Sequence, residues 1–240
     1  MTRRDRSAGC YIGRVDDQVA RLIHELRRCA GWEDLGGAIA AARELAARDS
    51  DAAVAALVSL LEDLDRVDLS DDAGDVGDEV WRTREALRHG LEACGRRSLV
   101  PLRSLVTRPP SPSGQVALLV LAKLGDDFAA PIAIDWVSQG VSAALLPLGL
   151  LAPPGAVAVL ARAIDHAGDD SWTKRLAAHA LGAIDTDAAL DVLEQLLEDR
   201  EWFARLGAAE ALRELAGDRA RRLLERARRD VDPRVVAAAG

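Results

Sequence analysis

Aromatic residues are scarce in this chain of 240 residues, which has two Phe, one Tyr and five Trp. Lysine is scarcer still: only Lys123 and Lys174 occur, so arginine supplies the rest of the positive charge. The formal net charge of -8 argues against nucleic acid as a partner, because neutralising phosphates requires clustered Lys and Arg. The apolar residues are mostly Ala, Leu and Val, which suit closely packed helices better than a sheet.

Cysteine is also rare, with Cys10, Cys29 and Cys94 far apart in the sequence and no C-x-x-C pair. An odd, scattered set of cysteines argues against a disulfide framework and a zinc knuckle, and it is typical of a reducing, cytoplasmic location. No apolar segment follows the first, polar residues, so we expect residues 1–12 to be a flexible tail rather than a secretory signal.

A long membrane-spanning run is missing as well. The stretch Trp136–Ala161 lacks charge, but Pro153 and Pro154 interrupt it. A double proline breaks a helix, so we predict two short buried helices there and no membrane span.

No complete catalytic or metal-binding motif is present. The four histidines are scattered, and no phosphate loop, nucleophile elbow or Cys/His pairing occurs. The acidic stretch 66–79 partly matches a calcium loop, but Ala73 stands where the sharp turn needs glycine. We therefore expect a solvated acidic loop at 66–79, no catalytic residue, no cofactor and no metal.

The sequence repeats itself. Residues 41–63 align without gaps on 177–199, with 13 identities in 23 positions. In both segments an Ala/Leu helix ends before an Asp-Ser/Thr-Asp turn, and leucines spaced by three and four follow. Ser50 and Thr186, or the Asp that follows each, are placed to cap the second helix of the unit.

This unit predicts helical hairpins near 33–63, 78–107, 113–138, 140–165, 170–199 and 201–230. An N-terminal helix, about Val15–Ala30, would cover the first hairpin. A further repeat starts at Asp232-Pro233 and leaves Val235 and Val236 without a partner, so an end-to-end homodimer through the C-terminal end is one expectation.

The segments Asp170–Ala178 and Arg200–Ala209, an acidic turn followed by Arg and Ala-Ala, resemble HEAT-like repeats, especially the short type described in phycobilisome lyases. Leu148-Gly149 and Leu181-Gly182 keep the Leu-Gly of that pattern. The resemblance implies an all-α fold, a right-handed α-solenoid (α-α superhelix) of about six hairpins in one array over residues 13–240. Such repeats serve scaffolds, adaptors, lyases and inhibitors alike.

The second helices of such hairpins usually line the concave side. We therefore expect a protein or peptide to bind their outward positions. These are Val58, Ile134, Asp135, Ala158, Arg162, Asp191, Glu194, Gln195, Arg222 and Arg226. The first four hairpins present small or apolar side chains there, the fifth presents acids and the sixth presents mostly arginines, which would fix the register of a partner.

Two enzyme-related alternatives remain open. The Asp135-Trp136 pair suggests a DNA-alkylation-repeat glycosylase, whose cleft uses Trp and Asp, although that cleft should be basic. A lyase-like chaperone or accessory of an enzyme is the other. Trp172 and Trp202 stand at matching places at the starts of first helices, and we predict that they pack between repeats.

Overall fold

The computed structural model describes residues 7–31, 34–48, 50–66 and 75–240, and these residues form α-helices and short 3-10 helices without a strand. The chain divides into two compact units, residues 1–120 and 121–240, and helix α6 (Pro112–Lys123) crosses the boundary. This secondary structure, together with the repeated helical hairpins, establishes an all-α helical-repeat fold. A single continuous array over residues 13–240 stays a prediction.

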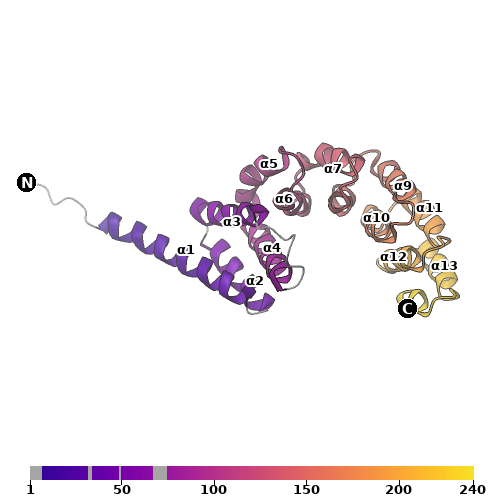
Figure 1. The fold of residues 1–240 in the computed structure, drawn as a ribbon. Helices are drawn as coiled ribbons and strands as arrows, with labels where there is room; N and C mark the ends of the chain where they lie inside the picture. The colour runs from indigo at the N-terminus through magenta and orange to yellow at the C-terminus, as the bar shows by residue number, and fades with distance from the viewer. Residues whose placement is uncertain (1–6, 32–33, 49, 67–74) are drawn as a thin grey trace, which may run out of the picture. The chain divides into compact units, whose positions relative to one another are not determined.

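The N-terminal unit begins with α1 (Ser7–Gly31), α2 (Leu35–Ala46) and α3 (Asp51–Asp63), followed by the 3-10 turn η1 (Leu64–Arg66). It continues with α4 (Asp75–Cys94), η2 (Gly95–Ser98) and α5 (Leu99–Val106). Helix α1 packs on α2, as the prediction of a covering helix requires (Figure 1). Leu22 and Leu26, one turn apart, are buried in this contact layer.

Two predicted boundaries in this unit differ from the structure. Helix α1 starts at Ser7 rather than near Val15. Residues 7–14 contain no proline and no pair of adjacent glycines, so nothing in them stops the helix from extending toward the N-terminus. Helix α4 starts at Asp75, so residues 75–79 are helical, and acidic residues such as Asp78 and Glu79 are favourable near a helix N-terminus. Residues 67–74 of the acidic loop predicted at 66–79 lie outside the described residues, as do residues 1–6 of the predicted tail, whose remaining residues 7–12 belong to α1.

The C-terminal unit contains two rows of helices (Figure 1). The first row is α8 (Leu145–Leu151, preceded by η3, Ser142–Ala144), α10 (Ser171–Ile184), α12 (Trp202–Arg213) and α14 (Pro233–Ala238). The second row is α7 (Ala129–Ser138), α9 (Ala156–Ala167), α11 (Asp187–Leu196) and α13 (Asp218–Ala227). We call these the first-helix row and the second-helix row.

Local capping explains where the hairpins turn. The Ser50 hydroxyl accepts a hydrogen bond from the Ala53 amide at 3.2 Å, and the Thr186 hydroxyl accepts one from Ala189 at 3.3 Å. Both caps confirm the prediction from the repeated Asp-Ser/Thr-Asp turn. The double proline lies in the turn between α8 and α9, where Ala152 has a φ of 43°.

Glycine residues lie at the contacts between neighbouring helices of the first-helix row. A Cβ on Gly149 would lie 2.6 Å from the Cα of Ala180, and a Cβ on Gly207 would lie 2.8 Å from the Cα of Arg175. Glycine therefore allows α8, α10 and α12 to approach backbone to backbone. The N-terminal unit repeats the device, because a Cβ on Gly90 of α4 would lie 3.0 Å from the Ala42 carbonyl oxygen of α2.

This close approach corrects the expected curvature of the C-terminal unit. The second helices were expected to line its concave side, but Figure 1 shows α9, α11 and α13 along the outer side and α10 and α12 along the inner side. When the helices of one row lie closer together than those of the other, the unit curves toward the closer row, which here is the first-helix row. In the sequence, the Leu-Gly pair at 148–149 marks this close approach, since a Cβ on Gly149 would overlap the Ala180 backbone.

The start of the last repeat is also packed. Val235 is fully buried and α14 packs on α12. The expectation that Val235 lacks a partner was wrong, because α14 already lies at the end of the first-helix row. The homodimer inferred from that expectation therefore loses its main argument.

A substitution at Gly149 tests the close approach of α8 and α10. In Gly149→Ala the new methyl group meets the Ala180 backbone, which cannot rotate away, so we expect a loss of about 2 kcal/mol of unfolding free energy. The matched control is Gly182→Ala, whose methyl group would lie 3.1 Å from the Ala211 Cβ. Urea unfolding followed by circular dichroism measures both, and equal stability of the two variants would contradict the proposed packing.

Candidate functional site

All ten residues predicted to face a partner lie at the surface. Val58 is half-buried on α3 of the N-terminal unit, and the other nine lie on the second-helix row of the C-terminal unit. Of those nine, Ile134 and Glu194 are half-buried and the rest are exposed. The exposure of these positions agrees with the helical period, and their contact with a partner stays a prediction. The helices α9, α11 and α13 lie along the outer side of the curve rather than the expected concave side (Figure 1).

The charges on α11 and α13 bind each other. Arg219 forms ion pairs with Asp191 and, at 3.1 Å, with Glu194. Arg226 pairs with Glu194 at 3.6 Å and with Glu198. Because these carboxylates already have partners, the predicted acidic end of the surface does not offer free charge to a ligand. Arg219 was missed, although it stands 28 positions after Asp191, the same spacing that joins Glu198 to Arg226.

A cleft opens between α7 and α9 of the second-helix row. Its volume is about 550 Å³, within the range of small-ligand pockets. Val137, Leu145 and Val159 form its apolar part. Its rim is polar and includes Gln139, Ser142, Arg162, His166, Asp170 and Thr173. We call this the α7–α9 cleft.

Most polar groups at the rim are occupied. Asp170 accepts hydrogen bonds from the Thr173 hydroxyl at 2.6 Å and from the backbone amides of Trp172 and Thr173. The hydrogen bond from the Thr173 hydroxyl is the main reason that the pKa of Asp170 is lowered. His166 donates from Nδ1 to the Arg162 carbonyl oxygen at 2.6 Å.

The guanidinium of Arg162 has no such partner among the described residues. It is exposed and forms no hydrogen bond or ion pair with any residue that the structure describes. A guanidinium presents several donors in a fork that matches a carboxylate. The α7–α9 cleft therefore combines apolar walls with one cation available to a ligand.

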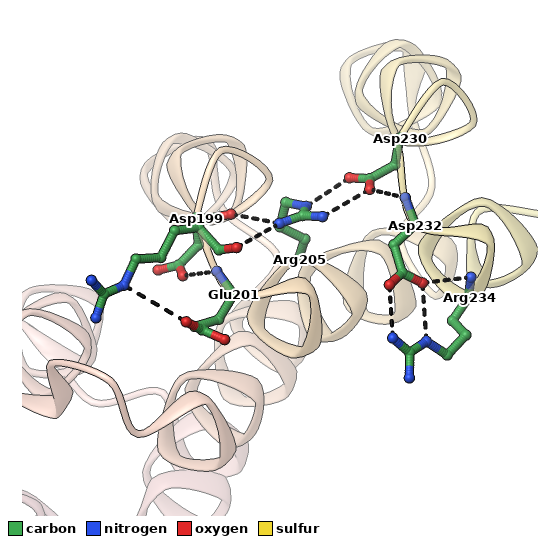
Figure 2. A network of polar contacts seen from close by, with 7 residues as sticks. Asp199, Glu201, Arg205, Asp230, Asp232 and Arg234 are labelled. Carbon is green, nitrogen blue, oxygen red and sulfur yellow. Dashed lines mark hydrogen bonds and ion pairs between the residues drawn. The ribbon is translucent and has the colours of Figure 1, made fainter.

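A second set of ion pairs holds the turns between hairpins. Lys174 Nζ lies 2.6 Å from Asp199 Oδ2, and both side chains are largely buried. Arg205 donates two hydrogen bonds to Asp230, at 2.7 and 2.9 Å, and one to the Asp199 carbonyl oxygen at 2.8 Å (Figure 2). Each cation and each aspartate recurs after 31 positions. These pairs fix the turn geometry and leave no free charge.

The same network continues into α14. Asp230 accepts a hydrogen bond from the Asp232 amide at 2.8 Å, and Asp232 caps α14 by accepting one from the Arg234 amide at 2.9 Å (Figure 2). The Arg234 guanidinium also donates to Asp232 and lowers the pKa of that carboxyl to about 2.

The aromatic residues pack differently from the prediction. Trp172 stacks on Phe203 with ring centroids 6.0 Å apart and remains 53% exposed. Trp202 contacts Phe203 edge-on at 5.2 Å, and the Arg234 guanidinium lies over the Trp202 ring. The residue 31 positions after Trp172 is Phe203, so the matching of Trp172 with Trp202 was off by one position. Packing between repeats is nevertheless what these rings do.

Trp136 weakens the glycosylase alternative. Its side chain is 2% exposed and belongs to the core, while Asp135 is exposed and accepts a hydrogen bond from Gln139 Nε2 at 2.7 Å. The pair therefore does not form a cleft with an aromatic wall. Within the described residues, no cluster of three or more His, Cys, Asp or Glu is arranged to hold a metal ion. Among those same residues, no helix has the length and apolar character needed to cross a bilayer.

Residues 139–213 and, overlapping them, 167–240 match the family model of HEAT repeats. The match covers the first-helix row from α8 to α14 and includes Arg162. A search of the curated proteins found no match.

The Arg205–Asp230 pair predicts a pH-dependent stability. The hydrogen bonds from Arg205 are the main cause of the lowered pKa of Asp230 in the folded chain. The stabilisation is therefore present above the ordinary carboxyl pKa of about 4 and is lost as the pH falls toward the lower, folded pKa. Asp230→Asn should lower the unfolding free energy at pH 7 by about 2 kcal/mol, since it leaves a largely buried guanidinium without its carboxylate.

The control for this prediction is Asp218→Asn, which removes an exposed pair with Arg221 and should cost less than about 0.5 kcal/mol. Urea unfolding at pH 7 and at pH 3 should show a larger pH dependence for the wild type than for Asp230→Asn. The same pH dependence in both proteins would show that the pair does not contribute.

Proposed function

From the match of residues 139–240 to the model of HEAT repeats, we propose that the chain is a non-catalytic scaffold that binds a protein or peptide. HEAT repeats commonly serve as protein-interaction scaffolds. The finer resemblance to the short, phycobilisome-lyase type stays a resemblance, and no observation on the described residues favours a lyase-like or glycosylase activity.

The α7–α9 cleft is the observation that carries the proposal. An apolar side chain of a partner would fill the space beside Val137 and Val159, and a carboxylate would pair with Arg162. Recognition of this kind needs a rigid surface, because ordering a flexible one on binding costs free energy. The capping of α10 by Asp170 and the Lys174–Asp199 pair supply that rigidity.

The binding surface is accordingly the second-helix row of the C-terminal unit. Arg162 lines the α7–α9 cleft, and Ile134, Asp135 and Ala158 lie on the same two helices. Asp191, Glu194 and Gln195 lie further along on α11. Val58 belongs to the N-terminal unit, and its contribution to binding remains a separate prediction.

A double substitution tests the surface. Ile134→Glu with Arg162→Glu places two carboxylates where the proposal requires an apolar contact and a cation, so capture of the partner should fall to background. A tagged pull-down from native lysate, analysed by mass spectrometry, measures the capture. Circular dichroism should show unchanged helicity, because neither side chain is in the core.

The matched control carries the same chemical changes in the N-terminal unit. Val100→Glu with Arg96→Glu replaces one exposed apolar residue and one exposed arginine, and it should capture the same protein as the wild type. The proposal fails if the Ile134/Arg162 variant still captures that protein, or if the control loses it equally.

A further inference from the structure

A second cleft lies between α11 and α13, at the C-terminal ends of both helices. Its volume is about 690 Å³, and it is open to solvent. Leu197 and Val231 supply its apolar surface, and Val231 is 93% exposed. Four arginines and four carboxylates complete the lining. We call it the α11–α13 cleft.

All four carboxylates that line the α11–α13 cleft form ion pairs. In the turns, Asp199 pairs with Lys174 and Asp230 pairs with Arg205. On the helices, Glu198 pairs with Arg226 and Glu225 pairs with Arg228. Each acid that faces the α11–α13 cleft therefore already has a cationic partner.

Two of the four arginines that line the cleft have side chains without an ion-pair partner among the described residues. The side chains of Arg222 and Arg229 are exposed, and their guanidinium groups form no hydrogen bond or ion pair within the described part of the chain. They stand seven positions apart, which places them on one face, at α13 and the turn after it. The cleft thus carries two unneutralised guanidinium groups beside exposed apolar surface, in a chain whose net charge is -8.

We propose that the α11–α13 cleft binds an acidic segment of a protein partner, whose carboxylates pair with Arg222 and Arg229 while an apolar side chain contacts Val231. This inference rests on the proposed scaffold function and adds the chemistry of the partner. Arginine forks bind carboxylates with two parallel hydrogen bonds. A short acidic segment meets only this local positive charge, whereas a long polyanion is repelled by the acidic remainder of the chain.

The test measures direct binding by the full chain. A fluorescent peptide of alternating Glu and Leu is titrated with the protein, and anisotropy reports binding, with a Gln/Leu peptide as the neutral control. The Glu peptide should bind more tightly than the Gln peptide, and added salt should weaken it because exposed charges are screened. Equal binding of the two peptides would overturn the inference.

Neighbouring arginines provide the matched variants. Arg222→Gln with Arg229→Gln should weaken binding of the Glu peptide roughly tenfold or more, as expected for the loss of two charge-assisted contacts. Arg221→Gln removes one positive charge at the position adjacent to Arg222, where the guanidinium pairs with Asp218, and should change the affinity by less than about twofold. An equal loss in Arg221→Gln would mean that only the general charge of α13 matters and would overturn the assignment.

Two further measurements distinguish an acidic-segment site from a nucleic-acid site and from the α7–α9 cleft. A DNA oligomer that binds more tightly than the Glu peptide, and depends on Arg222 and Arg229, would identify a nucleic-acid site and refute the inference. The Ile134/Arg162 variant should keep its affinity for the Glu peptide, since its changes lie at the other cleft. Loss of lysate capture alone in that variant supports both proposals, whereas retained capture there refutes the scaffold surface and leaves the acidic-segment site standing.

Discussion

The close approach of the first helices is the constraint on which the C-terminal unit depends. Where Gly149 and Gly207 face the next helix, the backbones come together at distances that no Cβ would allow. The first-helix row is therefore the tighter of the two, the unit bends toward it, and the second helices lie along the outer side (Figure 1). Two helices of that outer row, α7 and α9, border one cleft, and α11 and α13 border another. Small residues in one row thus determine where the other row offers a surface.

Ion pairing then decides which parts of that surface are available. Lys174 and Arg205 are used to hold aspartates in the turns (Figure 2), and Arg219 and Arg226 bind the acids of α11. These contacts stabilise the relation between neighbouring hairpins but are unavailable to a ligand. A count of charges along the sequence overstates the charge a partner would meet, because many of the acids and arginines in the described residues neutralise each other. Arg162, Arg222 and Arg229 are notable because they lie beside clefts and have no such role.

The sequence predicted local structure well and the arrangement of helices less well. The helix caps at Ser50 and Thr186 could be predicted because a hydroxyl just before a helix accepts a hydrogen bond from a backbone amide only three residues further along. The inner and outer rows were reversed because outward positions follow from the helical period alone, whereas curvature depends on how closely backbones of different helices approach. The Arg219–Asp191 pair was missed for a related reason, since it joins two helices whose offset only the fold specifies.

The central claim is that the second-helix row of the C-terminal unit receives a protein. Site-specific photo-crosslinking tests it most directly, with the reactive group placed at Gln139, on the rim of the α7–α9 cleft, or at Ala183, an exposed position on the first-helix row. The account predicts that one protein from native lysate becomes crosslinked through position 139 and not through position 183. Crosslinking of that protein through position 183 alone would place binding on the inner row and contradict the account.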